Sequence, residues 1–387
     1  MSAVPRTVVA LGAVSLFMDL SSELVHGLLP LLLTTVLGAS MVAVGIVEGI
    51  AEATASIVKV FSGALSDRFA RRKPLVLVGY ALAALSKPLF PLATSVPLVL
   101  VARFADRVGK GVRGAPRDAL IADVTPPGQR GAAYGLRQAL DTAGAVLGPL
   151  AAVGLMLVLA GDIRQVLWVA VLPAIAAVAV LVLYVKEPAR RAAGERAPRI
   201  AFASLGSLGR RYWTIVALGA VLTLARFSEA FLVLRAHELG LALALVPLVL
   251  VLMNLVYTAV AYPAGVAADR GHRRALLLCG IAALIAADLV IAAWPSVAAL
   301  AVGIVLWGAH MGLTQGLLSA LVADAAPVQL RGTAFGVFHL VSGAALLVAS
   351  VLAGWLWSAL GASATFYAGA AFCALALAGL AIAARQG

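Results

Sequence analysis

Ionisable residues recur at helical spacing inside apolar stretches of this 387-residue chain. Asp19, Glu23 and His26 are four and three positions apart, which places them within about 60° on one face of a helix. Two carboxylates and an imidazole suit a borderline divalent metal, and carboxylates at membrane depth can also carry protons. The spacing therefore predicts either a metal-binding face or a proton-carrying face.

Two further stripes share this spacing, one holding Glu48 and Glu52 and the other Arg103 and Arg107. A charged side chain exposed to lipid at mid-depth costs about 3 kcal/mol, so most of these groups must pair or line a wet cavity. The alternatives are that the charged groups form fixed structural ion pairs and that His310 is a packing residue. The candidate substrate-binding or proton-coupling residues are Asp19, Glu23, His26, Glu48, Glu52, Arg103, Arg107, Asp141, Arg226, Glu229 and His310.

The segments that carry these residues are long enough to cross a bilayer. The composition is 63% hydrophobic and 12% charged, whereas soluble domains carry about 25% charged residues. Apolar runs of about 20 residues recur along the chain, so we expect an all-α membrane protein with twelve transmembrane helices. A hydrophilic break divides the chain into an N-terminal six-helix bundle at 1–185, a cytoplasmic linker at 186–211 and a C-terminal six-helix bundle at 212–387.

The net charge of +12 comes from basic residues at helix ends, so no nucleic-acid partner is expected. Most Lys and Arg outside the spans fall on the side of both termini and the central linker, whereas Arg164 and Arg235 fall on the other side. The positive-inside rule then places both termini in the cytoplasm of a multi-pass protein of the bacterial inner membrane. Cys279 and Cys373 are isolated in apolar runs, without disulfide or metal-site spacing.

An internal repeat relates the two halves. One block returns after 202 residues and a second after 201 residues, and two six-helix halves of parallel topology are typical of a rocker-type transporter. Gly63, Asp67, Arg68, Arg71 and Arg72 return as Gly265, Asp269, Arg270, Arg273 and Arg274, and Ala122, Asp123, Pro126, Arg130 and Gly131 return as Ala323, Asp324, Pro327, Arg331 and Gly332.

These blocks resemble the major facilitator superfamily over nearly the whole chain. The family's loop signature is similar to 63–73, except that Ala70 and, in the second copy, His272 stand where Gly is usual. Residues 144–149 are similar to its antiporter motif, although Ala152 and Val153 replace the trailing glycines. An Asp at one helix end and Arg at the start of the next helix can hold one conformation of the transporter closed. The alternatives are that the Arg residues only anchor the topology and that the glycines only permit close helix packing. The implied gating residues are Gly63, Asp67, Arg68, Arg71, Arg72, Gly144, Gly148, Pro149, Asp269 and Arg270.

The resemblance implies a transporter that works by alternating access and is not an enzyme. Segments 19–23 and 106–123 are similar to a bacterial branch with nickel-resistance and iron or iron-citrate efflux permeases. We therefore expect proton-coupled efflux of a transition-metal ion or metal chelate, with a multidrug or other small-molecule exporter as the alternative and a proton-independent importer or uniporter also open. No cofactor is expected, the proton gradient supplies the energy, and the partners are the substrate and the lipid bilayer around a functional monomer.

Overall fold

The computed structural model describes residues 5–68, 71–187, 208–327 and 330–383, and its regular structure over these ranges is helical. The chain forms two compact units. The first consists of Met1–Leu37 with Thr54–Arg199, and the second of Gly38–Ala53 with Ile200–Gly387. Glu48 and Glu52 therefore belong to the second unit. The expected domain boundaries at 185 and 212 stay a prediction.

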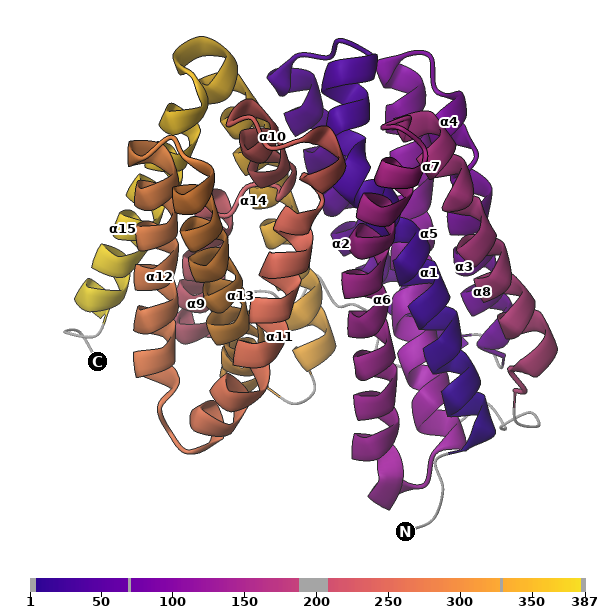
Figure 1. Ribbon diagram of the computed structural model, residues 1–387. Coiled ribbons are helices and arrows are strands. Elements are labelled where there is room, and N and C mark those ends of the chain that lie inside the picture. The colour runs from indigo at the N-terminus through magenta and orange to yellow at the C-terminus, as the bar shows by residue number, and fades with distance from the viewer. Residues whose placement is uncertain (1–4, 69–70, 188–207, 328–329, 384–387) are drawn as a thin grey trace. The chain divides into compact units, whose positions relative to one another are not determined.

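The first unit is built around α1, which runs beside α6 and α8, while α3 packs on α5 (Figure 1). Pro30 lies one residue before the end of α1, and the chain continues as a π-helical turn, Leu32–Val36. The helices are α1 (Arg6–Leu31), α2 (Met41–Arg68, shared with the second unit), α3 (Lys73–Ser86), α4 (Leu89–Leu92), α5 (Val96–Val124), α6 (Arg130–Val158), α7 (Ile163–Val169) and α8 (Val171–Tyr184).

In the second unit, α12 packs on α13 and α15, and α11 also packs on α13. The chain leaves helical geometry after Ala225 and re-enters it at Ala230, so one apolar segment is divided into two helices. The helices are α9 (Arg210–Ala225), α10 (Ala230–Glu238), α11 (Leu248–Asp269), α12 (Arg273–Ala293), α13 (Val297–Ala325), α14 (Arg331–Leu360) and α15 (Ala362–Ala383).

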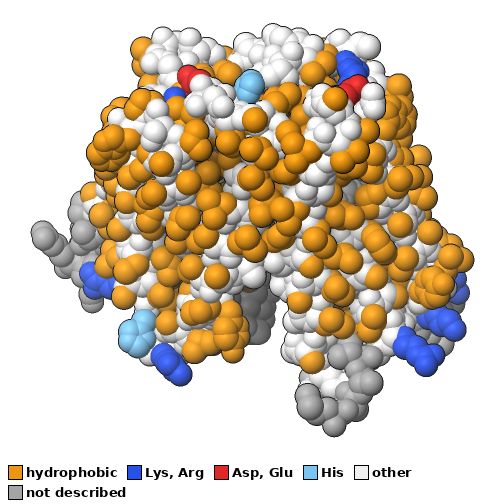
Figure 2. Space-filling model, viewed as in Figure 1, with side chains coloured by type: hydrophobic (Ala, Val, Ile, Leu, Met, Phe, Trp, Pro, Cys, Tyr) orange, Lys and Arg blue, Asp and Glu red, His pale blue; other side chains and the backbone are white. Residues whose placement is uncertain are grey.

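Apolar cores hold the helices of each unit together. In the first unit Leu11, Tyr80 and Leu120 join α1, α3 and α5, and in the second Tyr212 and Phe338 join α9 and α14. A hydrophobic band covers the middle of the visible face of each unit, with charged side chains toward its ends (Figure 2). That distribution is the one expected of a surface surrounded by lipid.

Ten segments within the described residues are long and apolar enough to cross a membrane. In contrast, α5 has sufficient length but carries Arg103, Asp106 and Arg107 in its first half, and the part of α15 whose side chains the structure describes, Ala362–Ala378, is shorter than a full span. The all-helical membrane fold is thus confirmed. Twelve spans stay a prediction that requires α5 and α15 to cross as well.

Candidate functional site

The acidic face of α1 lies directly against the glycines of α6. A Cβ atom placed on Gly144 would lie 3.0 Å from the Asp19 Cβ, and one placed on Gly148 would lie 2.8 Å from the Glu23 Cβ. Because both positions are glycine, the α1 turn that carries the two carboxylates approaches the α6 backbone closely. The structure thereby brings together two features that are far apart in sequence.

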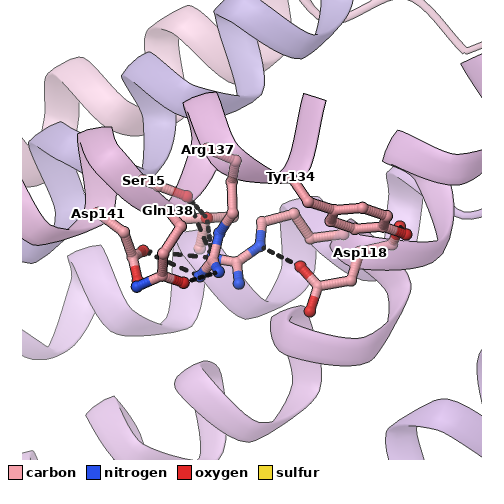
Figure 3. Close-up of polar contacts among 8 residues, drawn as sticks. Ser15, Asp118, Tyr134, Arg137, Gln138 and Asp141 are labelled. Atoms are coloured by element: carbon pink, nitrogen blue, oxygen red, sulfur yellow. Dashed lines mark hydrogen bonds and ion pairs between the residues drawn. The ribbon is translucent and has the colours of Figure 1, made fainter. Parts of the chain in front are cut away.

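The carboxyl groups of Asp19 on α1 and Asp141 on α6 lie close enough to interact with each other. Two carboxyl groups can share a hydrogen bond only when one of them carries a proton. The Arg137 Nη2 donates to the Asp141 Oδ1 at 3.0 Å, and the Arg117 Nη1 lies 3.8 Å from the same oxygen (Figure 3). The acid pair thus lies beside two guanidinium groups that can balance negative charge.

Arg117 connects this pair to two other helices, α3 and its own helix α5. Its Nη1 donates to the Ser15 Oγ at 3.1 Å and to the Tyr80 hydroxyl at 3.4 Å, and its Nε donates to the Asp118 Oδ1 at 3.1 Å (Figure 3). The Tyr134 hydroxyl in turn donates to the backbone carbonyl of Asp118 at 2.8 Å. The network therefore ties the positions of α1, α3, α5 and α6 to one buried guanidinium.

Sequence reasoning did not single out Arg117, Ser15 or Tyr80. A signal for Arg117 was available, because it stands seven residues after Lys110, close to two helical turns further along the basic stripe of α5. No comparable signal marks Ser15 or Tyr80. Their role depends on which helices pack together, and local spacing does not reveal that.

The three candidate metal ligands of α1 do not all face one another. The Glu23 Oε2 lies 3.3 Å from the His26 Nδ1, whereas Asp19 interacts with Asp141 on the neighbouring helix. No group of three or more His, Cys, Asp or Glu side chains suited to hold a metal ion occurs within the described residues. The helical face exists as expected, but its three members do not converge on one point in this structure.

A buried ion pair lies at another contact in the first unit. The Lys87 Nζ, just after α3, donates to the Asp106 Oδ1 of α5 at 2.8 Å and to the Ser22 Oγ of α1 at 2.9 Å. The two charged side chains are only 1% and 3% exposed. Lys87 therefore binds two neighbouring helices. Its positive charge balances the negative charge of Asp106, which lies on the same helix, α5, as Arg103 and Arg107.

The candidates of the second unit cluster around the break between α9 and α10. Arg226 and Glu229 lie within the break, and the Arg226 charge interacts with Glu229 and with Glu52. Glu48 is fully buried. His310 of α13 is 2% exposed, and its Nδ1 lies 2.8 Å from the backbone oxygen of Gly280 in α12. That contact agrees with the packing alternative for His310.

The repeated loop blocks contact each other within each unit. The Arg72 Nε donates to the Asp123 Oδ2 at 2.9 Å. In the second unit Arg273, the counterpart of Arg71, forms an ion pair with Asp324, the counterpart of Asp123. The Glu187 carboxylate additionally accepts from the backbone N–H groups of Arg72 and Lys73. An ion pair between the loop block and the end of the following long helix thus occurs in both halves.

The remaining gating candidates have mixed positions. Arg71, Asp269 and Arg270 are exposed, Gly271 has a φ of +94°, and the Pro149 side chain is buried within α6. The side chains of Asp67 and Arg68, and the surroundings of Gly63, lie outside the described part of the structure, although the α2 backbone extends to Arg68.

A two-unit helical membrane protein with the same loop motif and ion pair in each half is the architecture of a rocker-type transporter. The Major Facilitator Superfamily model matches residues 11–235 and 216–386, so the chain belongs to that superfamily. It is therefore a secondary transporter of a class that generally is not enzymatic and typically needs no cofactor.

Individual relatives agree with this assignment. The chain is 32% identical over 359 residues to the uncharacterized MFS-type transporter MJ1317 of Methanocaldococcus jannaschii, covering 91% of this chain and 88% of the relative. It is 34% identical over 133 residues to the multidrug resistance protein MdtH of Proteus mirabilis, covering 34% and 32% of the two chains. A bacterial homolog of the human lysosomal transporter Spinster, in an inward-facing and occupied conformation, shares the fold with a TM-score of 0.78 at 16% identity, covering 100% and 98%.

Proposed function

We propose that this transporter is a proton-coupled exporter of small organic solutes in which Asp19 and Asp141 share the coupling proton. The observation that carries the proposal is the proximity of these two carboxyl groups at the close contact between α1 and α6. Loss of the shared proton would leave two adjacent negative charges. Arg117 and Arg137 lie beside Asp141 and can balance part of that charge, so both protonation states are accessible to the site.

Movement of α1 against α6 provides a means of releasing the proton. Gly144 and Gly148 let the two backbones approach, so a small displacement at this contact changes the separation of Asp19 from Asp141. When the carboxyl groups separate, they no longer share the proton, and the proton affinity of each acid is then set by its own neighbours. Alternating access then exposes the acids to the two sides of the membrane in turn.

The substrate class is supported by the partial similarity to MdtH proteins, whose name describes multidrug resistance. Metal export is the competing candidate. A bare ion lacks a three-ligand group within the described residues, but an anionic metal chelate would suit the guanidinium groups of Arg103 and Arg107 on α5. The two candidates differ in whether apolar surface or positive charge dominates recognition.

Flux measurements in proteoliposomes test the coupling proposal. Asp19→Asn and Asp141→Asn should each abolish accumulation driven by a pH gradient while substrate counterflow continues, because exchange does not require proton release. Asp118→Asn is the matched control, since Asp118 also contacts Arg117 but is not part of the acid pair. Full pH-driven accumulation by both acid-pair variants would reject the proposal. Glu23→Gln and Glu52→Gln, measured alongside, test the two other candidate proton carriers.

A substrate panel separates the two solute classes. Amphipathic drugs, nickel, cobalt, zinc, iron and iron-citrate are added to vesicles that contain the wild-type protein, with empty vesicles as the control. Drug flux stimulated by a pH gradient supports the organic-solute proposal, whereas flux of a metal or of iron-citrate alone selects the competing candidate.

We also place the protein in the bacterial inner membrane as a monomer with both termini in the cytoplasm. The bias of Lys and Arg toward the side of the termini supports this orientation. A reporter fused near Gly194 should be cytoplasmic and one near Ser296 should be outside, and the opposite labelling would reverse the assignment.

A further inference from the structure

Asp288 of α12 is a carboxyl group that the proposed coupling pair does not use. Its side chain is fully buried in the second unit, and neither carboxyl oxygen has a hydrogen-bond partner within the described residues. The Oδ2 occupies the space left by the missing side chain of Gly369 on α15, where a Cβ atom would collide with it. The carboxyl group thus lies inside the α12–α15 packing, away from any solvent surface of its unit.

The surroundings of Asp288 disfavour a negative charge. The Gly369 Cβ position is also 3.2 Å from the carbonyl oxygen of Ala225, the last residue of α9. The final carbonyl groups of a helix lack intrahelical partners and form the negative end of its dipole. An ionised carboxylate here would therefore lie close to another concentration of negative charge.

The ionisable groups on the elements packed around α12 do not neutralise it. From α15 the nearby group is the Cys373 thiol, which is also an acid. His310 of α13 is directed to the Gly280 carbonyl, and Arg235 of α10 binds Glu238 and the Ile291 carbonyl. The Arg226 charge, in the break itself, interacts with Glu229, Glu52 and Tyr257. No ion pair of Asp288 occurs within the described part of the chain.

We propose that Asp288 is a proton-binding site of the second unit and that its carboxyl group is neutral within the packing of α9, α12 and α15. A neutral acid can donate a hydrogen bond to a carbonyl oxygen, whereas a carboxylate can only accept one. The site is separate from Asp19 and Asp141, so the proposal does not rest on the proposed transport function. Proton release from it requires opening of the contacts among α9, α12 and α15.

Asp106 provides a matched control in the same protein. It is an aspartate with nearly the same burial, at 2% exposure against 0% for Asp288, but it pairs with Lys87 at 2.8 Å. An aspartate with a buried cation partner is ionised, whereas one without a partner keeps its proton. The two residues should therefore give opposite spectroscopic signatures at neutral pH.

Infrared difference spectroscopy of the full-length protein reads these signatures directly. Subtracting the spectrum of Asp288→Asn from that of the wild type should reveal the carbonyl band of a protonated carboxylic acid. Subtracting Asp106→Asn should reveal carboxylate bands instead. A carboxylate signature for Asp288 would overturn the proposal. If Asp288→Asn does not fold, Gly369→Ala should shift the protonated-acid band in the otherwise wild-type chain, and an unshifted band would count against Asp288 as its source.

The pH dependence of stability gives a second, independent readout. The folded protein holds a proton at Asp288 that the unfolded chain releases at neutral pH, so raising the pH favours unfolding of the wild type. Asn cannot lose this proton, and the melting temperature of Asp288→Asn should therefore fall less between neutral and alkaline pH. Parallel curves for the two proteins would contradict the proposed site.

Discussion

The two units share a fold pattern and a loop motif but differ in what fills their interiors. Ion pairs and acid pairs connect the helices of the first unit, as at Lys87 with Asp106 and at Asp19 with Asp141. The second unit instead contains a cluster of aromatic rings around the α9–α10 break, with neighbouring ring centroids 5.4 to 6.2 Å apart. The cluster consists of Phe227, Phe231, Trp307, Trp357 and Phe366.

This difference shows which part of a repeated architecture is constrained by the repeat. Arg72 with Asp123 and Arg273 with Asp324 join the same two repeated blocks in the two halves, although Arg273 is the counterpart of the neighbouring Arg71. The buried side chains between the helices do not correspond. A fold therefore constrains its loop contacts without fixing its interior chemistry. The ion pairs and the acid pair of the first unit suit proton movement, whereas the aromatic surface of the second unit suits apolar packing or an apolar solute.

Removing the cation of the buried pair should have the largest effect on stability. Lys87→Ala leaves the Asp106 carboxylate buried without a counter-ion, and breaking such a pair costs about 3–5 kcal/mol. Unfolding by denaturant in detergent measures the loss. The double variant Lys87→Ala with Asp106→Asn should recover part of it because no charge is left unpaired. If the double variant is the less stable of the two, the interior of the first unit does not depend on charge balance.

Truncating the aromatic cluster should have a slightly smaller effect. Phe227→Ala removes contacts with Phe231, Trp307 and Phe366, and the cost should be about 3 kcal/mol, the low end for this change, because the adjacent helix break can relax into the cavity. The unfolding assay used for Lys87→Ala applies here. Unlike Lys87→Ala, this loss should not depend on pH. A pH-dependent loss would show that the packing of this cluster is coupled to an ionisable group.

The sequence predicted the helical segments and the repeat because both leave local signals. The lengths of the apolar runs predicted the membrane spans, and the two repeated sequence blocks predicted the two halves. The acid pair was only partly predictable: Asp19, Asp141, Gly144 and Gly148 were all candidates, but their proximity depends on the packing of α1 against α6.

The face formed by Asp19, Glu23 and His26 shows the limit of helical spacing as a predictor. Spacing fixes the direction in which a side chain leaves the helix, whereas its partners are set by rotamers and by the neighbouring helices. Here His26 is near enough to pair with Glu23, and Asp141 on α6 is near enough to bind Asp19. A set of residues on one face therefore did not become a three-ligand group.

Matched glycine substitutions test whether the α1–α6 contact has a role beyond packing. A Cβ on Gly148 would lie 2.8 Å from the Glu23 Cβ, and a Cβ on Gly312 would lie 2.8 Å from the Val260 Cβ. Gly148→Val and Gly312→Val should each destabilise the protein by about 1–3 kcal/mol through overpacking. Only Gly148→Val should also weaken pH-driven accumulation in proteoliposomes. Equal flux losses per folded molecule would assign the α1–α6 glycines to packing alone.

The smallest stability effects should come from the loop ion pairs that the two units share. The Arg72 and Asp123 side chains are 23% and 20% exposed, and those of Arg273 and Asp324 are 38% and 45% exposed, so water and salt screen both pairs. Replacing either Arg by Gln should cost about 0–1 kcal/mol, with the larger cost at Arg72 because it also donates to the Ser66 Oγ. Transport should fall in both variants if the pairs hold one conformation closed, although folding is nearly unchanged. Measuring flux and unfolding on the same preparations separates these effects, and normal flux in both variants would reduce the shared pairs to anchors of the helix ends.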